Sequence, residues 1–573
     1  VICPRMQVGP RYLTRFLLNL ALILLFQGAT NSISAQVRTL GTVHYDDSLA
    51  FEGYTLFSPN PSKSTFLIDN CGRVVNRWFT EHRPGFMAYL LPDGKLLKAG
   101  KWENATQFDD IPGSGGVLEI YDWESNLLWQ YPVVDQAHGQ HHDVHPLPNG
   151  NVLYIAWESF DSAAVADAGR PPININHGKL WSEKIVEIRP IFPDSAEIVW
   201  EWRAWDHMIQ DYDSSKANYG VVADHPGRLD VNFYGRYGLG VEWLHFNAVT
   251  CHEGLDLIMI SSRQMDEIYI IDHSTTTQEA AGSTGGLRGK GGDFLWRWGN
   301  PWAYDHGNST NQAFFGQHHP NWIPAGSPDA GKIMIFNNGT NRPSGDWTSV
   351  EMLAPPMDSL GNFAYTPGQA FGPDSAHTVY RDSVPTDWHA QWISGADRLP
   401  NGNTLICDGV RGTFFEVTPD REEVWRYVNP ASWNGILSQG DTLPYTDPSS
   451  LPNKVFRCIR YAPDYPAFVG RDLTPGPEVE LHPWPLCDTS TVARTEQLRP
   501  KPWLAPVPTM DFLEVRIAAL RPRTYRVRDV YGAVVAQGSL RRGHLRLDVS
   551  SLAAGLYLLE VEGHVATRFL KQN

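Results

Sequence analysis

The sequence has little cysteine, no heptad-patterned stretches and no excess of positive charge. Its 573 residues include 6 cysteines, none of them in a CxxC pair, so a redox motif or zinc site of that type is not indicated. The lack of helical heptads excludes a coiled coil. The formal net charge of -16 argues against nucleic acid as a partner, because phosphate binding requires a basic surface.

Apolar stretches long enough to span a membrane are also lacking. The N-terminal apolar run, Phe16–Phe26, is shorter than the roughly 20 residues of a membrane-spanning helix. It follows Arg11 and Arg15 and precedes the small-residue site Ser34–Gln36, which is the order of a secretory signal peptide. We therefore predict that residues 1–35 are a signal peptide, removed on export.

Loss of the signal peptide leaves five cysteines. Export permits disulfides, and Cys458 and Cys487 are the predicted pair because they flank one proline-rich stretch. The other three, Cys71, Cys251 and Cys407, lie in strand-like contexts typical of buried free thiols. Because five is an odd number, at least one cysteine is expected to stay unpaired.

Aromatic residues, glycine and proline are abundant. The chain has 21 tryptophans, 50 glycines and 42 prolines, a combination typical of an all-β protein with many turns. One turn phrase recurs: residues 91–97 (LPDGKLL) return as 147–153 (LPNGNVL) and 399–405 (LPNGNTL), with looser copies near Gly254 and Gly326. Each copy opens on turn residues and continues as an apolar strand.

A second phrase closes most of these units. It is a short apolar segment that ends in tryptophan, at Trp78, Trp129, Trp200, Trp296 and Trp425. A further unit at 332–365 lacks the tryptophan. Six self-similar units predict a six-bladed β-propeller over residues 36–470. The alternative is a β-sandwich whose turns resemble one another by chance.

The character of the chain changes after residue 470. Residues 471–505 are proline-rich and aperiodic, which predicts a linker. Residues 506–573 predict a small β-sandwich, and their phrases "LDVSSLAAGLYLLEV" and "TRFLKQ" resemble the C-terminal sorting domain of the Bacteroidetes type IX secretion system. This resemblance implies a secreted or outer-membrane surface-attached protein, with the type IX secretion machinery as a partner. The alternative is an ordinary accessory sandwich.

The first polar cluster is HHDVH at 141–145, just before the second turn phrase. Strand alternation places His141, Asp143 and His145 on one face and His142 on the other. Imidazoles with a carboxylate suit zinc or iron. Residues that precede an inner propeller strand can equally face the axis as hydrogen-bond donors. Both interpretations stay open at this point.

A second cluster places His245 and Asn247 on one strand face, and the strand that follows ends in Ser-Ser-Arg at Arg263. A buried arginine is costly unless it meets an anion or an acid, so Arg263 binds a ligand or pairs with a structural carboxylate. The third cluster, FGQHHPNW, and the fourth, which begins at His389, precede the fifth and sixth inner strands. Histidines at one position in several units favour a functional interpretation.

The phrases "HHDVHPLPNGN", "WLHFNAVTCHEGLDLIMISSR" and "FGQHHPNW" resemble bacterial arylsulfate sulfotransferases, and the resemblance covers residues 50–475. It implies a six-bladed propeller enzyme that moves a sulfuryl group from a phenolic sulfate ester to a phenol by a ping-pong mechanism through a sulfohistidine. No nucleotide sulfate donor, cofactor or metal is expected. Small aromatic sulfate esters and phenols are the implied partners.

The resemblance also assigns roles to residues. It implies that His318, which follows Gln317, is the nucleophile, and His319 is a weaker candidate. The supporting residues that it implies are His245, Asn247 and Arg263.

A further active-site histidine is implied in the first cluster, with His142 as first choice and His141 as second. His389 has no counterpart in the family. Aromatic residues near the clusters are candidates to stack on the aryl ring, with packing as the alternative: Trp243, Phe315 and Trp392.

These residue types suit sulfuryl transfer. As in phosphoryl transfer, a loose anionic group moves between two oxygens, so catalysis consists mainly of positioning and charge stabilisation. Arg263 offers a permanently charged fork, and a neutral His318 imidazole can attack sulfur. Another histidine can protonate the departing phenolate and deprotonate the incoming phenol. The alternatives are a non-catalytic surface propeller that binds a ligand or protein, and a metal-dependent propeller enzyme with its metal at 141–145.

Overall fold

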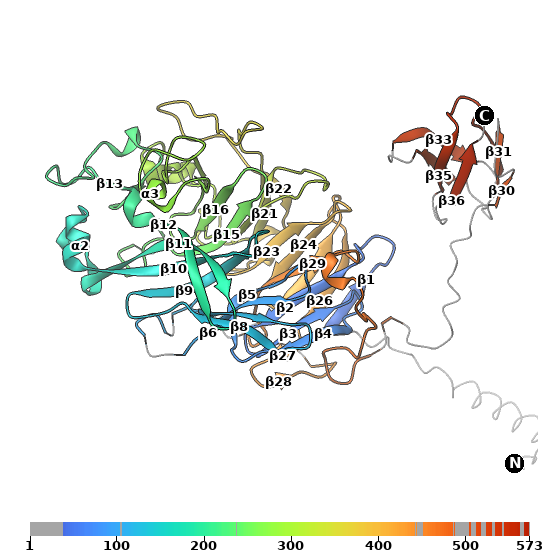
Figure 1. Ribbon diagram of the computed structural model, residues 1–573, viewed down its shortest axis with the longest axis horizontal. Helices are drawn as coiled ribbons and strands as arrows, with labels where there is room; N and C mark the ends of the chain where they lie inside the picture. Colours follow the sequence, from blue (N-terminus) through green and yellow to red (C-terminus); the bar gives the residue numbers. More distant parts are fainter. Residues whose placement is uncertain are drawn as a thin grey trace, which may run out of the picture. The chain divides into compact units, whose positions relative to one another are not determined.

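The computed structural model divides into two compact units, residues 1–486 and 487–573 (Figure 1). The described residues are 38–484 except 104–105, 110, 237, 442 and 444–450, then 486–487, 503–505, 512–516, 523–529, 533–540, 544–561 and 567–571. The predicted signal peptide at 1–35 lies outside them. None of the helices within the described ranges has the length and apolarity needed to cross a membrane.

The first unit is built from six antiparallel sheets of four or five strands, so the all-β prediction is confirmed. The first sheet has the order β29 (Val455–Tyr461), β2 (Tyr54–Pro59), β3 (Ser64–Ile68), β4 (Val74–Phe79). The second is β5 (Pro84–Leu90), β6 (Leu96–Lys101), β7 (Gly116–Tyr121), β8 (Leu127–Pro132). The third is β9 (His138–Pro146), β10 (Val152–Asp161), β11 (Lys179–Ile191), β12 (Ser195–Arg203).

The remaining three large sheets follow the same plan. The fourth is β15 (Phe246–His252), β16 (Leu257–Ser262), β17 (Glu267–Asp272), β18 (Trp296–Trp298). The fifth is β19 (His318–Trp322), β20 (Ile333–Asn337), β21 (Ser349–Leu353), β22 (His377–Tyr380). The sixth is β23 (Gly395–Arg398), β24 (Thr404–Asp408), β25 (Thr413–Val417), β26 (Glu423–Val428), β1 (Gly41–Tyr45).

One edge strand of each sheet, here called the inner strand, packs against the inner strands of the neighbouring sheets. The contacts close a ring in the order β29, β5, β9, β15, β19, β23 and back to β29. Strands from both ends of the unit complete two sheets, because β29 pairs with β2 and β1 pairs with β26. This pairing ties the end of the unit to its beginning.

The repeated tryptophans have a structural explanation. Each is buried, and its indole N–H donates to the next sheet around the ring. The bonds are Trp78 to Asp122 O (2.8 Å), Trp129 to Ser195 O (2.7 Å), Trp200 to Thr275 Oγ1 (3.2 Å), Trp296 to Gly372 O (2.8 Å) and Trp425 to Asn70 O (2.7 Å). A buried indole needs such a partner, so each tryptophan fills the gap between two sheets and also fixes their spacing.

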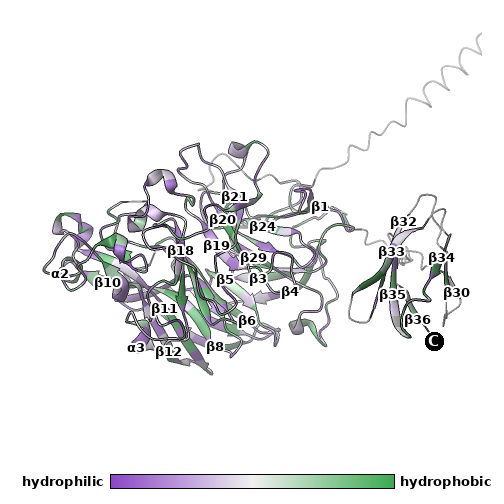
Figure 2. Ribbon diagram, turned by 90° about the horizontal axis from the view of Figure 1, so that it is seen from above, coloured by the Kyte–Doolittle hydropathy of each residue, from purple (hydrophilic) through white to green (hydrophobic). Residues whose placement is uncertain are grey.

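The recurring turn phrase also has a physical basis. Its glycine adopts a positive φ, 85° at Gly150 and 91° at Gly402, which residues with a Cβ rarely adopt. The turns place the apolar strands β10 and β24 back into the core, and Figure 2 shows hydrophobic and hydrophilic residues mixed along the strands of this unit. Helices are short, with α2 at Ser162–Asp167 and α3 at Thr277–Ala280.

Small additional sheets complete the description. In the first unit β13 (Met208–Ile209) pairs with β14 (Leu229–Asp230), and β27 (Ala431–Ser432) pairs with β28 (Gly435–Ile436). The second unit has one sheet of β30 (Trp503–Ala505), β31 (Phe512–Arg516), β34 (His544–Asp548). Its other sheet is β33 (Val534–Leu540), β32 (Arg523–Arg528), β35 (Gly555–Val561), β36 (Thr567–Lys571). Residues from both sheets form its hydrophobic core, including Leu513, Leu547, Val527 and Phe569.

The predicted pair of Cys458 and Cys487 is wrong. Cys458 is a free, buried thiol in β29, where it packs in the same hydrophobic cluster as Cys407. The prediction of a free thiol is also wrong for Cys71, because Cys71 and Cys487 are disulfide-bonded, whereas it is confirmed for Cys251 and Cys407. The prediction failed because it relied on the short distance along the chain between Cys458 and Cys487, whereas Cys458 lies buried within the inner strand β29.

Candidate active site

A backbone irregularity recurs in the inner strands and at the start of the last one. Non-glycine residues adopt positive φ at Phe86 (93°), His142 (53°), His245 (51°), His319 (50°) and Ile393 (46°). The strand pairing shifts register beside the first four. Such bulges interrupt the alternation of side chains and redirect them. The ring therefore presents side chains toward its centre that a regular strand would separate.

His141 and His142 show this effect directly. The two Nδ1 atoms lie 2.8 Å apart, although neighbouring residues of a regular strand point to opposite faces. The predicted separation of His142 from His141 is therefore wrong, because the bulge at His142 breaks the alternation. One of the two Nδ1 atoms carries the proton that joins them.

Four of the predicted site residues lie together near the centre of the ring. The rings of His142 and His245 are 4.6 Å apart between centroids. Arg263 and His318 lie close enough that Arg263 lowers the pKa of both His142 and His318. All four side chains are buried, with residue exposures of 3%, 9%, 6% and 2% for His142, His245, Arg263 and His318. We call these four residues the histidine–arginine cluster.

His318 is held in a defined orientation by Asn338. Its Nδ1 lies 2.7 Å from Asn338 Oδ1 and 3.0 Å from the Gly316 carbonyl. The Asn338 amide nitrogen donates to the carbonyls of Ala390 and Ile393 at 2.7 and 3.0 Å, so its Oδ1 must be the acceptor. Nδ1 of His318 therefore carries a proton, and Nε2 has the free lone pair when the ring is neutral.

Two carboxyl groups support the other histidines. Glu183 Oε2 lies 3.2 Å from His141 Nε2, and both Glu183 oxygens accept the Phe246 N–H at 2.9 Å. Glu242 Oε2 lies 2.8 Å from His245 Nδ1, and Oε1 accepts the Trp157 indole N–H at 3.0 Å. His141 is also stacked on Trp157, with 4.0 Å between ring centroids. These groups surround His141 and His245 behind the cluster.

Three of the buried histidines, His141, His142 and His318, are neutral at neutral pH. Burial lowers the pKa of His141 from 6.5 to about 3. Burial, together with the neighbouring His245, holds the pKa of His142 well below its ordinary value. Burial and the charge of Arg263 do the same to the pKa of His318. A neutral imidazole can act as a nucleophile or as a base, whereas an imidazolium cannot.

Asn247 links two inner strands beside the cluster. It is fully buried, and its amide nitrogen donates to the Gln317 carbonyl at 2.7 Å. The Gln317 amide in turn donates to Ser261 Oγ and to the carbonyls of Ser262 and Glu267 at 3.2, 3.0 and 2.8 Å. These bonds fix Gln317, which directly precedes His318. Asn247 therefore helps to position His318 through the backbone of Gln317.

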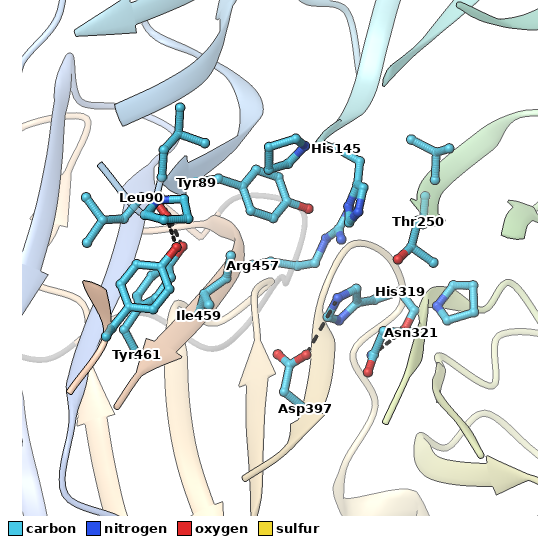
Figure 3. A pocket seen from close by; sticks show the side chains of 17 residues that line it. Tyr89, Leu90, His145, Thr250, His319, Asn321, Asp397, Arg457, Ile459 and Tyr461 are labelled. Atoms are coloured by element: carbon cyan, nitrogen blue, oxygen red, sulfur yellow. Dashed lines mark hydrogen bonds and ion pairs between the residues drawn. The ribbon is translucent and has the colours of Figure 1, made fainter. Parts of the chain in front are cut away.

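His319 points away from the cluster into a separate cavity of about 250 Å³ (Figure 3). The cavity is lined by side chains from the ring strands, among them Tyr89, His145, Asp397 and Arg457. His319 Nε2 lies 3.8 Å from Asp397 Oδ1. Burial raises the pKa of Asp397 to about 7 and lowers the pKa of His145 to about 4. Burial thus favours the neutral forms of both side chains.

A buried ion pair joins the first polar cluster to this cavity. Arg457 Nη2 lies 2.6 Å from Asp143 Oδ2, and both side chains are almost fully buried. Asp143 also accepts the Val249 N–H at 3.1 Å. Within the described residues, His141, Asp143 and His145 thus contact three different sets of partners.

The remaining predicted residues lie outside the histidine–arginine cluster. Trp243 is buried in a hydrophobic cluster, and its indole N–H donates to the Phe233 carbonyl at 3.3 Å, an arrangement that suits packing. Phe315 lies under the Arg342 guanidinium, 5.4 Å from the ring centroid. Trp392 lies beside the Lys454 ammonium at 5.4 Å, and His389 Nε2 lies 3.1 Å from Thr340 Oγ1.

Sequence reasoning missed the residues that support the histidines. Asn338, Glu183 and Glu242 belong to no repeated phrase, and nothing in the sequence distinguishes them from other polar residues in or beside strands. Asn338 follows Asn337 at the end of β20, close to the position that Ser262 and Arg263 occupy after β16. A comparison of units strand by strand could have suggested that residue as a site neighbour.

The family model described as Arylsulfotransferase (ASST) matches residues 47–429, and the model described as Secretion system C-terminal sorting domain matches residues 504–571. No curated protein matches the chain.

Solved structures show only distant similarity. A protein of unknown function from Bacteroides caccae is 9% identical with a TM-score of 0.34, covering 67% of this chain and 97% of that one. Hydrazine synthase of Kuenenia stuttgartiensis is 10% identical with a TM-score of 0.30, covering 69% and 81%. Virginiamycin B lyase from Staphylococcus aureus is 10% identical with a TM-score of 0.27, covering 60% and 69%.

Proposed function

Because the chain belongs to the arylsulfotransferase family, we propose that it moves a sulfuryl group from a phenolic sulfate ester to a phenol through a sulfohistidine at His318. The closed ring of six sheets supports the interpretation of the first unit as a six-bladed propeller. The histidine–arginine cluster then lies on the propeller axis, where residues from several blades meet.

The observation that carries the proposal is the environment of His318. Asn338 and the Gly316 carbonyl hold the proton on Nδ1, so the lone pair is on Nε2. Burial and Arg263 keep the ring neutral. A buried, oriented, neutral imidazole beside a permanent positive charge is what attack on an anionic sulfate ester requires.

In the first half-reaction, Nε2 of His318 attacks sulfur, the N–S bond forms and the ester S–O bond breaks. The electron pair of that bond leaves with the phenolate. Arg263 stabilises the negative charge on the transferred group, which moves almost in line between its donor and acceptor atoms. Because His142 is neutral at neutral pH, the phenolate departs without a proton from it, so donors with more acidic phenols are expected to react faster.

In the second half-reaction, the acceptor phenol loses its proton and its oxygen attacks the sulfohistidine. The S–O bond of the new ester forms, the N–S bond breaks and Nε2 regains its lone pair. His142 is the proposed base, since it is neutral and its ring lies beside His245, and it releases the proton to solvent before the next cycle. Glu183 and Glu242 hold His141 and His245 behind it.

Export is part of the proposed function. The C-terminal sorting domain supports secretion and attachment at the cell surface. We propose that the type IX secretion machinery recognises this domain, after a signal peptide at 1–35 has directed passage across the inner membrane. The proposed substrates are then aromatic sulfates and phenols that reach the protein outside the cytoplasm.

The test is a transfer assay on the exported form of the chain. A chromogenic aryl sulfate is mixed with protein in the absence and presence of a second phenol, without any nucleotide. Without acceptor, we expect one burst of phenol per active site and a mass increase of one SO3 unit on the peptide that contains His318. With acceptor, turnover should continue and the sulfated acceptor should accumulate.

The variant His318→Ala, with unchanged thermal stability, should lose both the burst and the mass increase. His389→Ala is a matched control, since this histidine lies outside the histidine–arginine cluster. Absence of turnover across a broad panel of aryl sulfates, with folded protein, would refute the proposal and favour a ligand-binding propeller. Turnover that survives in His318→Ala would refute the sulfohistidine while leaving the transferase activity in place.

A further inference from the structure

A second group of reactive side chains lies at one end of the fourth sheet, apart from the histidine–arginine cluster. Cys251 lies near the end of β15, Asp256 lies in the turn to β16 and His273 follows β17. Their possible ligand atoms all lie within 4.8 Å of one another, and the three residues are half-buried. The His273 N–H donates to the Asp256 carbonyl at 3.1 Å, which fixes the two backbone segments side by side.

The imidazole of His273 is held between two carboxylates. Its Nδ1 lies 2.7 Å from Asp256 Oδ1, and its Nε2 lies 2.9 Å from Glu187 Oε2. Glu187 belongs to β11 of the neighbouring sheet, and its other oxygen accepts from the Asn151 amide at 2.5 Å. Glu187 therefore fixes the ring so that Nδ1 faces the Asp256 carboxylate.

We propose that Cys251, Asp256 and His273 bind one Zn²⁺ ion, with Glu187 as the carboxylate that orients His273. Thiolate sulfur, imidazole nitrogen and carboxylate oxygen are the ligands that zinc prefers, at about 2.0–2.3 Å from the metal. Tetrahedral ligand atoms at such distances are separated by roughly 3.3–3.8 Å, so the three groups need only small side-chain adjustments. Three protein ligands leave the fourth position to water.

The carboxylate–histidine arrangement is the feature that distinguishes this group from a chance cluster. Histidines that ligate metals usually donate their other ring nitrogen to a carboxylate or carbonyl, as Nε2 of His273 does with Glu187. Binding displaces the thiol proton and the proton on Nδ1, and both leave to solvent. Zn²⁺ thus replaces two protons, and the net charge of the four side chains with the ion stays the same.

The site would brace two sheets. Three ligands come from the fourth sheet, and the orienting carboxylate comes from the third. The His273 ring also contacts Trp200, with 4.7 Å between centroids, and Trp200 is one of the tryptophans that join neighbouring sheets. The bound ion therefore reinforces an existing junction, and it takes no part in sulfuryl transfer.

The experiment measures metal content and metal spectra of the full chain as exported. Protein is stripped with a strong chelator and titrated with Zn²⁺, and separately with Co²⁺ as a spectroscopic probe. We expect one Zn²⁺ per chain, a thiolate-to-cobalt charge-transfer band, and a rise in thermal stability on Zn²⁺ addition. Cys251→Ser should lose the charge-transfer band. Glu187→Gln should weaken Zn²⁺ affinity by about 10- to 100-fold, as expected for an orienting carboxylate.

The control variant is Cys458→Ser, which removes another free thiol and should leave the band unchanged. Asp256→Asn serves if Cys251→Ser does not fold. The proposal would be overturned if the wild-type protein failed to bind Zn²⁺. It would also be overturned if Cys251→Ser and Asp256→Asn bound Zn²⁺ with the wild-type affinity. His273 would then be an imidazolium between two carboxylates. Aryl sulfate turnover is expected to be the same in stripped and zinc-loaded protein, so this test is independent of the proposed function.

Discussion

Replacement of Asn338 by alanine tests how the proposed nucleophile is held. The amide oxygen accepts from His318 Nδ1 at 2.7 Å, and the amide nitrogen bonds two carbonyls. Without the side chain, Nδ1 keeps only the Gly316 carbonyl at 3.0 Å, and the ring gains freedom to rotate. For a buried imidazole, the loss of such a hydrogen-bond partner costs about 1–3 kcal/mol. We therefore expect the rate of sulfohistidine formation to fall by about 10- to 100-fold.

A matched control is present at the adjacent position. Asn337 is also fully buried and also makes three hydrogen bonds, to the Phe315 N–H, the Ala313 carbonyl and Glu351. None of these partners is a histidine of the cluster. Asn337→Ala and Asn338→Ala should therefore lose similar stability, about 3 kcal/mol for three bonds, while only Asn338→Ala slows the chemical step.

The assay is a single-turnover burst of phenol release, measured over pH with thermal unfolding alongside. Asn338→Asp provides a second readout, because a carboxylate beside Nδ1 raises the pKa of His318 and moves the acid limb of the rate profile to higher pH. Equal rate losses in Asn337→Ala and Asn338→Ala would refute the reasoning, since the effect would then come from general destabilisation. An unchanged burst rate in Asn338→Ala would refute the positioning role itself.

Three further predictions concern charge and position. Arg263→Gln should raise the pKa of His318 and shift the acid limb of the burst rate to higher pH, whereas Arg263→Lys should keep the limb and still lose about 100-fold in rate. Acidification should destabilise the protein, because an unfolded histidine takes up a proton below pH 6.5 while His141 resists it down to about 3. By about pH 4.5, His141 alone lowers the free energy of unfolding by about 2–3 kcal/mol. The free energy of unfolding in urea should therefore depend less steeply on pH in His141→Gln than in the wild type, and an unchanged slope would contradict this. His319→Asn should keep the burst rate within about 3-fold, because His319 faces the separate cavity and asparagine tolerates its positive φ; a loss as large as that of His318→Asn would contradict the placement.

Much of the fold was predictable because its repeats reflect local physics. A glycine with positive φ is needed at each tight turn, so the LPNG phrase predicts where a strand begins. A buried indole needs a partner, so the tryptophan that closes a unit predicts contact with the next sheet. The pairing of β29 with β2, which closes the ring of sheets, was harder to predict. Nothing local in residues 455–461 indicates a partner strand at 54–59.

The sequence predicted that the histidines would gather near the centre of the fold. It did not predict which of them would join Arg263 and which would line the separate cavity. Sequence alternation assumes regular strands, and the bulges at His142, His245 and His319 break that assumption. One extra residue in a strand decides that His318 joins Arg263 while His319 joins Asp397. A bulge is stabilised by the packing of a whole ring of strands, and therefore has no short sequence signal.

The same bulges explain why the ring can hold two polar clusters on one axis. A regular inner strand would send every second side chain into the core between sheets, and few polar groups would reach the centre. The bulged strands instead give residues of one segment to different clusters: His142 and His318 to one, His145 and His319 to the other. The Arg457–Asp143 ion pair lies among the same strands and neutralises the two charges buried there. The burial of His318, which the proposed mechanism requires, therefore depends on the backbone of the ring as much as on the histidine itself.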